Sequence, residues 1–493
     1  MQGSTIGLIV PSQHWRSSTP EEQGMDSATL AGALEFARDT NLPLHSITVI
    51  RNGSLVLDAY FYPYGPGVLH DVASVTKSVT SALIGIAIDQ GHLRSVEQPM
   101  LEFFPGRTVP NLDTHKRAIT VEHLLTMTSG LDCGFAPTEA ELFAMLRSQN
   151  WVEFALGLPM KLAPGTRFAY CSPGVHLLAG IIRATTGESP VDFARRHLFE
   201  PIGIQEVVWP ADQQGVNHGF GNLHMHPHDM ARLGYLYLHQ GAWESKQILR
   251  PAWVSASTSP RVSVPSDGSG WVRSYGYLWW ISPGFYAAVG RGGQVIAVHP
   301  EKHMVVVLTG GGSVTYVKGL FAPTGLLLGH LFPAAVSAQS LQTNLAAHAR
   351  LASLVEATTR PPAPEAVAPM PDTARRIAGK TYRLDENRRG WHSFALRFAP
   401  DEGSLAIQIM GSQLHFAVGL DNVYRLSPGI FGLPVAARGA WKAADAFALE
   451  LNEVGNINDW RITFTFRDDR VILTVAEMTG LPGVTVEGRI EGP

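Results

Sequence analysis

A serine and a lysine stand three residues apart at the start of an apolar segment. From Ala73 the chain reads ASVTKSVT and continues as SALIGIAIDQG, which is almost without charge. A helix that begins at Ser74 brings Ser74 and Lys77 to the same face, one turn apart. A serine hydroxyl is a poor nucleophile until a base takes its proton, and burial disfavours the charged form of a lysine. The pattern therefore indicates a nucleophilic serine that is activated by its lysine neighbour.

The same spacing also fits a structural role. A serine that caps a helix and a lysine whose stem lies along apolar surface produce the same S-x-x-K pattern. A nucleophile at a helix N-terminus would in addition have free backbone N–H groups beside it, which stabilise an oxyanion. The rest of the chain has to separate these two interpretations.

Two further segments hold residue types that suit acyl transfer. FAYCSPGVHLLAGIIRATTG places Tyr170 before a cysteine and a serine, and GRGGQVIAVHP places Arg291 and two glycines at the start of a β-rich run. A serine, a tyrosine and a cation followed by glycine, in this order, resemble the serine β-lactamase and penicillin-binding-protein superfamily. The segments LLTMTSGL, HDMARLGYLYLHQGAW and YGYLWW resemble its class C-like branch, which includes carboxylesterases, D-aminopeptidases and 6-aminohexanoate-dimer hydrolase. The resemblance covers about residues 20–335.

The resemblance implies a division of roles. Ser74 is the nucleophile that becomes acylated, Lys77 holds the proton network that helps to deprotonate it, and Tyr170 is the general base that passes the proton to the leaving group. The oxyanion hole consists of the backbone N–H groups of Ser74 and Gln294, with Gln294 on an edge strand.

Further positions are implied as substrate contacts. Gly292 and Gly293 let a substrate approach the strand closely, and Arg291, Ser172 and Trp279 are expected to border it. Arg291 fits an exposed turn equally well, and Trp279 fits the packing of a strand core equally well.

The chain departs from the superfamily's pattern at two places. The Tyr-x-Asn element reads Tyr170-Cys171-Ser172, so the asparagine amide is missing, and the Lys-Thr-Gly element reads Arg291-Gly292-Gly293, which keeps a cation but loses a hydroxyl. Both changes suit an ester or a linear amide better than a β-lactam carboxylate. We therefore expect a carboxylesterase with amidase activity that needs no cofactor. A β-lactamase, a D-aminopeptidase and an acyl-accepting sensor without turnover are the alternatives.

Hydrophobic patterning predicts an α/β fold with helices on an antiparallel sheet. Two apolar runs surround Asn52-Gly53, which is a strong hairpin signal, and short β-rich runs return between residues 275 and 311. Helical patterns occupy residues 26–40, 74–91 and 174–187. Strands from both ends of this part should form one sheet, in the β-lactamase-like arrangement that the resemblance implies.

The composition changes near residue 358. Residues 1–357 are expected to form the hydrolase domain, with a helix over 338–357, and residues 358–375 read as a Pro-rich linker. Alternating apolar residues over 376–493 predict an all-β barrel or sandwich. This C-terminal domain could serve packing or oligomerisation, or could narrow the active-site mouth, and the oligomeric state stays open.

Composition also limits the partners and the location. The formal net charge of -4 gives no electrostatic argument for nucleic acid or an anionic membrane, and no apolar run reaches the ~18 residues of a membrane span. The first residues lack the basic region and the apolar length of a signal peptide, so a cytoplasmic location is expected, unless an export signal has been removed. Cys133 and Cys171 are expected to be free buried thiols, with a single pairing as the alternative.

Three histidines alternate in the segment HMHPH, as His224, His226 and His228. Imidazole is a common zinc ligand, but Pro227 and the helical pattern that follows interrupt the strand, and no cysteine or carboxylate pattern lies nearby. No metal is therefore expected.

Overall fold

The computed structural model of the chain describes residues 15–133, 140–265, 272–312, 323–409, 411–479 and 482–491. Its contacts form two compact units. The first unit comprises Met1–Asp58, Asp71–Thr309 and Thr315–Leu354, and the second comprises Ala59–His70, Gly310–Val314 and Val355–Pro493. The second unit thus includes a segment that lies shortly before Ser74 in the sequence. The domain boundaries expected near residues 357 and 376 stay a prediction.

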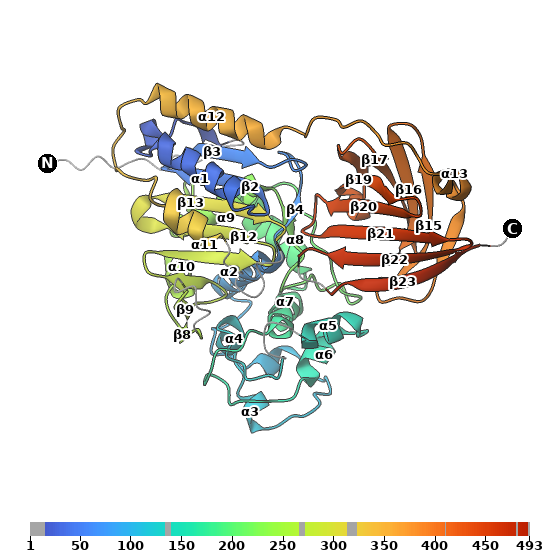
Figure 1. Cartoon of the computed structure of the whole chain (residues 1–493). Helices are drawn as coiled ribbons and strands as arrows, with labels where there is room; N and C mark the ends of the chain where they lie inside the picture. Colours follow the sequence, from blue (N-terminus) through green and yellow to red (C-terminus); the bar gives the residue numbers. More distant parts are fainter. Residues whose placement is uncertain are drawn as a thin grey trace. The chain divides into compact units, whose positions relative to one another are not determined.

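A nine-stranded sheet runs through the first unit (Figure 1). In spatial order its strands are β1 (Arg16–Ser17), β3 (Ser54–Tyr60), β2 (Leu44–Arg51), β13 (Met304–Gly310), β12 (Gln294–His299), β11 (Phe285–Gly290), β10 (Trp280–Ser282), β9 (Ser274–Tyr275) and β8 (Val262–Ser263). Early strands and late strands meet where β2 lies beside β13, which is the arrangement that the hydrophobic pattern predicts. The described pairings from β8 to β13 are antiparallel, whereas β1 pairs in parallel with β3. The predicted α/β fold is confirmed.

Two local features of the sheet bear on the predictions. Asn52 and Gly53 connect β2 to β3 with positive φ angles of 49° and 77°, and positive φ at both positions is what a two-residue type I′ turn requires. Gln294, by contrast, begins β12, which has β11 and β13 as neighbours. The expectation of an edge strand at Gln294 is wrong, because β8, β9 and β10 continue the sheet beyond β11.

Helices cover the sheet and fill the middle of the first unit (Figure 1). They are α1 (Ser27–Asp39), α2 (Thr76–Asp89), α3 (Thr114–Arg117), α4 (Val121–Leu125), α5 (Ala140–Arg147), α6 (Trp151–Gly157), α7 (Ser172–Thr186), α8 (Pro190–Ala194), α9 (Pro227–Leu238), α10 (Pro251–Ser257) and α11 (Thr324–Leu326). Helix α9 packs on β2 and β12, and α1 packs on α11. Every residue of β2, β11 and β13 is buried, so both faces of the central sheet are covered.

The segment that carries Ser74 and Lys77 is a short 3-10 turn followed by α2. The turn spans Ala73–Val75 and α2 begins at Thr76, so Ser74 lies just before the α-helix. All but the last two residues of α2 are buried. Gly91, with a φ of 78°, lies just beyond the helix end and provides the left-handed conformation common there.

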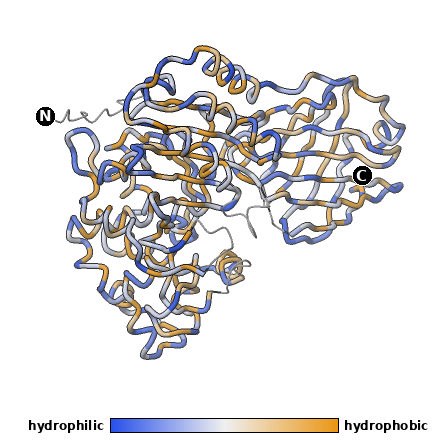
Figure 2. Tube along the Cα trace, turned by 60° about the vertical axis from the view of Figure 1, so that its left-hand side comes forward, coloured by the Kyte–Doolittle hydropathy of each residue, from blue (hydrophilic) through white to orange (hydrophobic). Residues whose placement is uncertain are grey.

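The second unit is a closed β-barrel. Its strands are β14 (Thr381–Leu384), β15 (Trp391–Phe398), β16 (Glu402–Ile409), β17 (Ser412–Gly419), β18 (Arg425–Pro428), β19 (Pro434–Ala443), β20 (Ala446–Glu453), β21 (Asp459–Arg467), β22 (Arg470–Glu477) and β23 (Val484–Ile490). A pairing between β17 and β19 closes the ring, and β18 pairs with β19 beside it. Hydrophobic and hydrophilic residues alternate along these strands (Figure 2), because successive side chains point to opposite faces. Of the two predicted all-β architectures, a barrel and a sandwich, the structure shows the barrel.

Helix α13 (Asp372–Ile377) precedes the barrel in the second unit. Helix α12 (Leu345–Thr359) belongs to the first unit up to Leu354 and to the second from Val355, and it begins later than the predicted helix over 338–357. The segment Ala59–His70 is bound through its tyrosines: the Tyr64 hydroxyl donates to Asn452 Oδ1 at 2.6 Å, and the Tyr424 N–H donates to the Tyr62 hydroxyl oxygen at 3.0 Å. Among the residues described, no helix combines the length and the hydropathy that crossing a membrane would require.

Replacing two helical glycines by alanine should have opposite effects on the free energy of unfolding. A Cβ at Gly85 of α2 would lie 2.5 Å from the Trp253 ring, whereas a Cβ at Gly32 of α1 would lie 3.7 Å from His330 Nδ1. Gly85→Ala should lower the free energy of unfolding by about 1–3 kcal/mol through overpacking. The matched control Gly32→Ala should leave it unchanged or raise it by up to about 1 kcal/mol, because alanine favours the helix. Urea unfolding of both variants measures this, and equal effects would contradict the packing at Gly85.

Candidate active site

Ser74 and Lys77 are in direct contact at the start of α2. Lys77 Nζ lies 2.9 Å from Ser74 Oγ and 2.8 Å from the carbonyl oxygen of Phe220. Lys77 is only 1% exposed, whereas Ser74 is half-buried. The two residues are one turn apart, so the local backbone is sufficient to bring the amine to the hydroxyl.

The backbone just before Ser74 is held in an unusual conformation. Ala73 has a φ of 46°, in the left-handed region that a non-glycine residue seldom adopts. The Ala73 N–H donates to Asp71 Oδ1 at 2.7 Å, and Thr76 Oγ1 donates to the Ala73 carbonyl at 2.6 Å. Such strain persists only where the surroundings impose it, and it clusters at functional sites. The conformation of Ala73 fixes the orientation of the next residue, Ser74, within the turn.

The loop that carries Phe220 supplies the second partner of Lys77. Thr80 Oγ1 donates to the carbonyl of Gly219 at 2.7 Å, which ties the loop to α2. The Phe220 ring stacks on His218, with centroids 5.8 Å apart and planes 4° apart. Sequence reasoning missed this loop because a carbonyl acceptor leaves no mark on residue type.

Below the loop lies a buried pair of titratable groups. His176 Nε2 is 3.1 Å from Asp212 Oδ2. Burial lowers the pKa of His176. Burial opposes ionisation of Asp212, but hydrogen bonds from His176 and from the N–H groups of Val216 and Gln214 outweigh it and lower the pKa of the carboxyl. Burial, with a smaller contribution from His176, lowers the pKa of the adjacent His218 to about 4. His218 is therefore neutral at pH 7.

Tyr170 is the third predicted catalytic residue, and it reaches the same place from a different part of the chain. Lys77 Nζ lies 4.8 Å from the centroid of the Tyr170 ring. That ring stacks on Trp280, with centroids 6.0 Å apart and planes 15° apart. Ser74, Lys77 and Tyr170 are thus brought together, while Ser172, which begins α7, is buried with 1% of its surface exposed.

The turn between β11 and β12 lies beside the nucleophile. A Cβ built on Gly290 would come within 2.9 Å of the Ser74 backbone nitrogen, so only glycine lets β11 approach this closely. Gln294 pairs with Gly290 across the hairpin, and its Nε2 donates to the Arg291 carbonyl at 3.1 Å.

Arg291, Gly292 and Gly293 form the turn itself. The two glycines have φ angles of 89° and 97°, which a residue with a side chain seldom adopts. The turn therefore requires these glycines whether or not a substrate passes beside them. Arg291 is half-buried.

Trp279 and Trp280 have different surroundings. Trp279 is fully buried and packs on Tyr237 and Tyr286, which favours the packing alternative over the predicted substrate contact. Trp280 stacks on Tyr170 instead. Trp279 directly precedes β10 and Trp280 begins it, and residue type alone could not assign the two tryptophans to these different surroundings.

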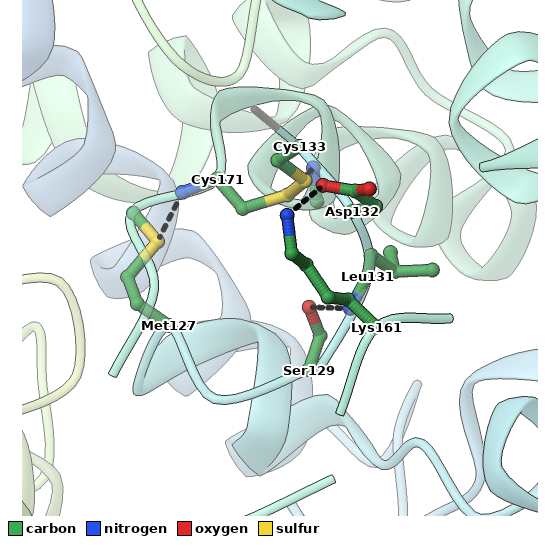
Figure 3. The surroundings of a disulfide bond; sticks show 8 residues. Met127, Ser129, Leu131, Asp132, Cys133, Lys161 and Cys171 are labelled. Atoms are coloured by element: carbon green, nitrogen blue, oxygen red, sulfur yellow. Dashed lines mark hydrogen bonds and ion pairs between the residues drawn. A yellow bond between two sulfur atoms is a disulfide. The ribbon is translucent and has the colours of Figure 1, made fainter. Parts of the chain in front are cut away.

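The two cysteines are paired. Cys133 and Cys171 form a disulfide (Figure 3), so the expectation of free thiols is wrong and the alternative of a single pairing is confirmed. The bond joins segments 38 residues apart in the sequence, a proximity that sequence spacing does not reveal. Disulfides persist mainly in oxidising compartments. The cytoplasmic location stays a prediction.

The three alternating histidines have separate partners. His228 Nε2 lies 2.9 Å from Asp58 Oδ2, His226 Nε2 lies 3.4 Å from Glu206 Oε2, and His224 Nδ1 lies 3.0 Å from the Asn222 carbonyl. Among the described residues, no group of three or more histidine, cysteine or carboxylate side chains is placed to hold a metal ion.

Comparison with known families decides the affiliation of the chain. The family described as Beta-lactamase matches residues 22–315, which is more than half of the chain. The chain belongs to the Beta-lactamase family. It is thus a member of the serine β-lactamase and penicillin-binding-protein superfamily, in which catalysis through an acylated serine is a family property.

Individual relatives of this family are distant. The chain is 24% identical over 280 residues to the 6-aminohexanoate-dimer hydrolase of Paenarthrobacter ureafaciens, across 52% of this chain and 70% of that protein. It is 27% identical over 190 residues to the lovastatin esterase of Penicillium rubens, across 34% of this chain and 47% of that protein. The solved structure of a β-lactamase/D-alanine carboxypeptidase from Yersinia pestis matches 62% of this chain and 98% of its own, with 18% identity and a TM-score of 0.50. That likeness concerns the fold alone.

The buried histidines predict a loss of stability in acid. The unfolded chain takes up a proton at His218 near its ordinary pKa of 6.5, whereas the folded protein does so only near about 4. Because the unfolded state binds more protons between these values, the free energy of unfolding should fall as the pH falls from 6.5 to 4, by on the order of 2 kcal/mol from this group. Urea unfolding at pH 7.5 and pH 5 measures the difference.

A pair of variants isolates this contribution. His218→Gln should lose less stability between the two pH values than the unmodified protein, and some loss should remain because of His176 and Asp212. His115→Gln, at an exposed position, should keep the full loss. An unchanged pH dependence in His218→Gln would contradict the assignment.

Proposed function

We propose that the protein is a serine hydrolase that cleaves carboxylic esters and linear amides through an acyl-enzyme at Ser74. The observation that carries the proposal is the contact of the buried Lys77 amine with Ser74 Oγ at 2.9 Å, with the Tyr170 ring beside the same amine. A reactive hydroxyl, a buried base and a phenol at one place are the groups that acyl transfer needs.

The hydrogen-bonding capacity of Lys77 supports a role in proton transfer. A neutral amine has two hydrogens and one lone pair. It would donate to the Phe220 carbonyl at 2.8 Å and accept the Ser74 hydroxyl proton as Oγ attacks the carbonyl carbon of the substrate. Tyr170 would then deliver a proton to the leaving group, because a leaving alcohol or amine departs more easily when protonated.

The oxyanion of the tetrahedral intermediate would be bound by the backbone N–H groups of Ser74 and Gln294. The close approach of β11 to Ser74 at Gly290 and the pairing of Gly290 with Gln294 support this pair of donors. Fixed N–H dipoles stabilise the developing charge without having to reorganise during the reaction. Water then attacks the acyl-enzyme in the reverse sequence and releases the acid.

The choice of ester and amide substrates is supported by two relatives, a 6-aminohexanoate-dimer hydrolase and a lovastatin esterase. It is also supported by the two departures from the superfamily's pattern. Ser172 is buried at the start of α7, where an asparagine amide would otherwise stand, and Arg291 offers a planar fork in place of a lysine.

Three substitutions should separate the roles of the residues. Ser74→Ala should abolish the release of p-nitrophenol from p-nitrophenyl butyrate, because no acyl acceptor remains. Lys77→Ala and Tyr170→Phe should each lower kcat by about 10²- to 10⁴-fold, the usual contribution of a positioned proton-transfer group. The measurement is steady-state release of p-nitrophenol per folded molecule.

Ser81→Ala is the matched control for Ser74→Ala. Ser81 is buried in the same helix and its Oγ has no hydrogen-bond partner, so its loss should leave turnover unchanged. Turnover that survives in Ser74→Ala would refute the proposal. A single stoichiometric burst would favour the sensor, and cleavage of nitrocefin as fast as that of the ester would favour a β-lactamase.

A further inference from the structure

The residue that holds Tyr170 in place is Met127, in the loop that follows α4. The Ala169 N–H donates to the Met127 carbonyl at 2.8 Å, and the Cys171 N–H donates to Met127 Sδ at 3.3 Å. Met127 thus binds the residue on each side of Tyr170, and Figure 3 shows its contact with Cys171. Its own φ of 59° is in the left-handed region, a strain that its surroundings must impose.

The disulfide ties the same tyrosine a second time. Cys171 directly follows Tyr170 and caps α7, where its Sγ accepts the Gly174 N–H at 3.3 Å. Its partner Cys133 is buried, with 4% of its surface exposed. Through this bond, the residue next to Tyr170 is fixed covalently to the end of the segment that begins at Met127.

That segment is itself firmly anchored. The Asp132 N–H donates to the Pro159 carbonyl at 2.8 Å, and the Lys161 N–H donates to the Gly130 carbonyl at 2.8 Å. A Cβ at Gly130 would lie 2.2 Å from the Leu162 carbonyl oxygen, so the segments around Gly130 and Leu162 approach too closely for any residue other than glycine at position 130. The disulfide therefore links Cys171 to a segment that is held in place by backbone hydrogen bonds.

We propose that the Cys133–Cys171 disulfide and Met127 are positioning elements that hold the Tyr170 ring beside Lys77, so that full hydrolytic activity requires the oxidised protein. This inference rests on the proposed function for its kinetic consequence. Met127 and the two cysteines are positioning residues in it and are not among the reacting groups Ser74, Lys77 and Tyr170. When the bond is cut, the segment around Tyr170 loses its covalent tie to Cys133 and keeps noncovalent contacts, among them those with Met127 and Trp280. The Tyr170 ring is then held less tightly beside Lys77.

Reduction by a phosphine is the direct test. The phosphine transfers two electrons to the disulfide and becomes a phosphine oxide with oxygen from water, while Cys133 and Cys171 each gain a proton and become thiols. Alkylation and intact mass then count two thiols per chain and show that reduction is complete. The assay is carried out well below the unfolding temperature, with the number of active sites measured from the burst of p-nitrophenol.

The expected result distinguishes positioning from general stability. Reduction should lower kcat per active site by about 10- to 100-fold, while KM changes by no more than about twofold because the substrate contacts remain. A loss of active sites with an unchanged kcat per remaining site would overturn the proposal.

Variants repeat the test without a reductant. Cys133→Ala should behave as the reduced protein does, and the phosphine should change it no further. Met127→Leu, which removes only the sulfur acceptor, should lower kcat in the same direction by a smaller factor, with KM unchanged. Lys161→Ala is the control, because it breaks the exposed ion pair of Lys161 with Asp132 beside the disulfide and leaves both cysteines paired; its kcat should stay unchanged.

Hydrogen exchange separates this inference from the proposed function. Reduction should raise amide exchange in peptides that cover residues 165–176, while peptides of α2 keep their exchange rates. If the oxidised protein shows no Ser74-dependent hydrolysis, the proposed function fails, and a rise confined to residues 165–176 still supports the positioning. Complete reduction without any change in that region would overturn the positioning whatever the activity.

Discussion

The central constraint in the first unit is the burial of the Lys77 amine. A charged or polar group removed from water is costly unless it is hydrogen-bonded, and Lys77 is 1% exposed. Its nitrogen has Ser74 Oγ on one side and the Phe220 carbonyl on the other. Both partners depend on precise local structure, since Ser74 leaves a turn strained at Ala73 and Phe220 belongs to a loop bound to α2 through Thr80. The same burial that makes the contact costly to form is what allows a lysine to act as a base.

Several distant parts of the chain converge on that amine. The loop with Phe220 rests on His218 and on the buried pair of His176 and Asp212. Tyr170 arrives from the residues before α7, between the ring of Trp280 and the amine. The central sheet, covered on both faces, provides the end of β11 at Gly290, against which the Ser74 turn packs. A site assembled in this way needs every contributing segment to be fixed, which is the role that we propose for Met127 and the disulfide at Tyr170.

The sequence was informative where the signal is local. The spacing of Ser74 and Lys77 fixes their contact because both belong to one helical turn, and Asn52-Gly53 marks its hairpin because few residues accept two positive φ angles in a row. The alternation of Phe394, Leu396 and Phe398 likewise marks the barrel, since a strand has a period of two. The affiliation with the Beta-lactamase family followed from several such local motifs in the right order, and the family match confirms it.

The rest depends on contacts between segments far apart in the chain. No sequence pattern predicts the roles of the Phe220 carbonyl and the Met127 sulfur, because every residue has a backbone carbonyl and any methionine has a thioether. The pairing of Cys133 with Cys171 depends on a fold that brings residues 38 apart together. The interior position of β12 and the burial of Trp279 depend on how many strands continue the sheet. These features require coordinates.

The most direct test of the account is to trap the covalent intermediate. The protein would be mixed with p-nitrophenyl butyrate, quenched in acid within milliseconds, digested and analysed by mass spectrometry. The account predicts one butyryl group per chain, located on Ser74. Butyrylation at another residue, or turnover in which no acylated Ser74 can be trapped while the ester is still in excess and its hydrolysis is slow, would contradict it.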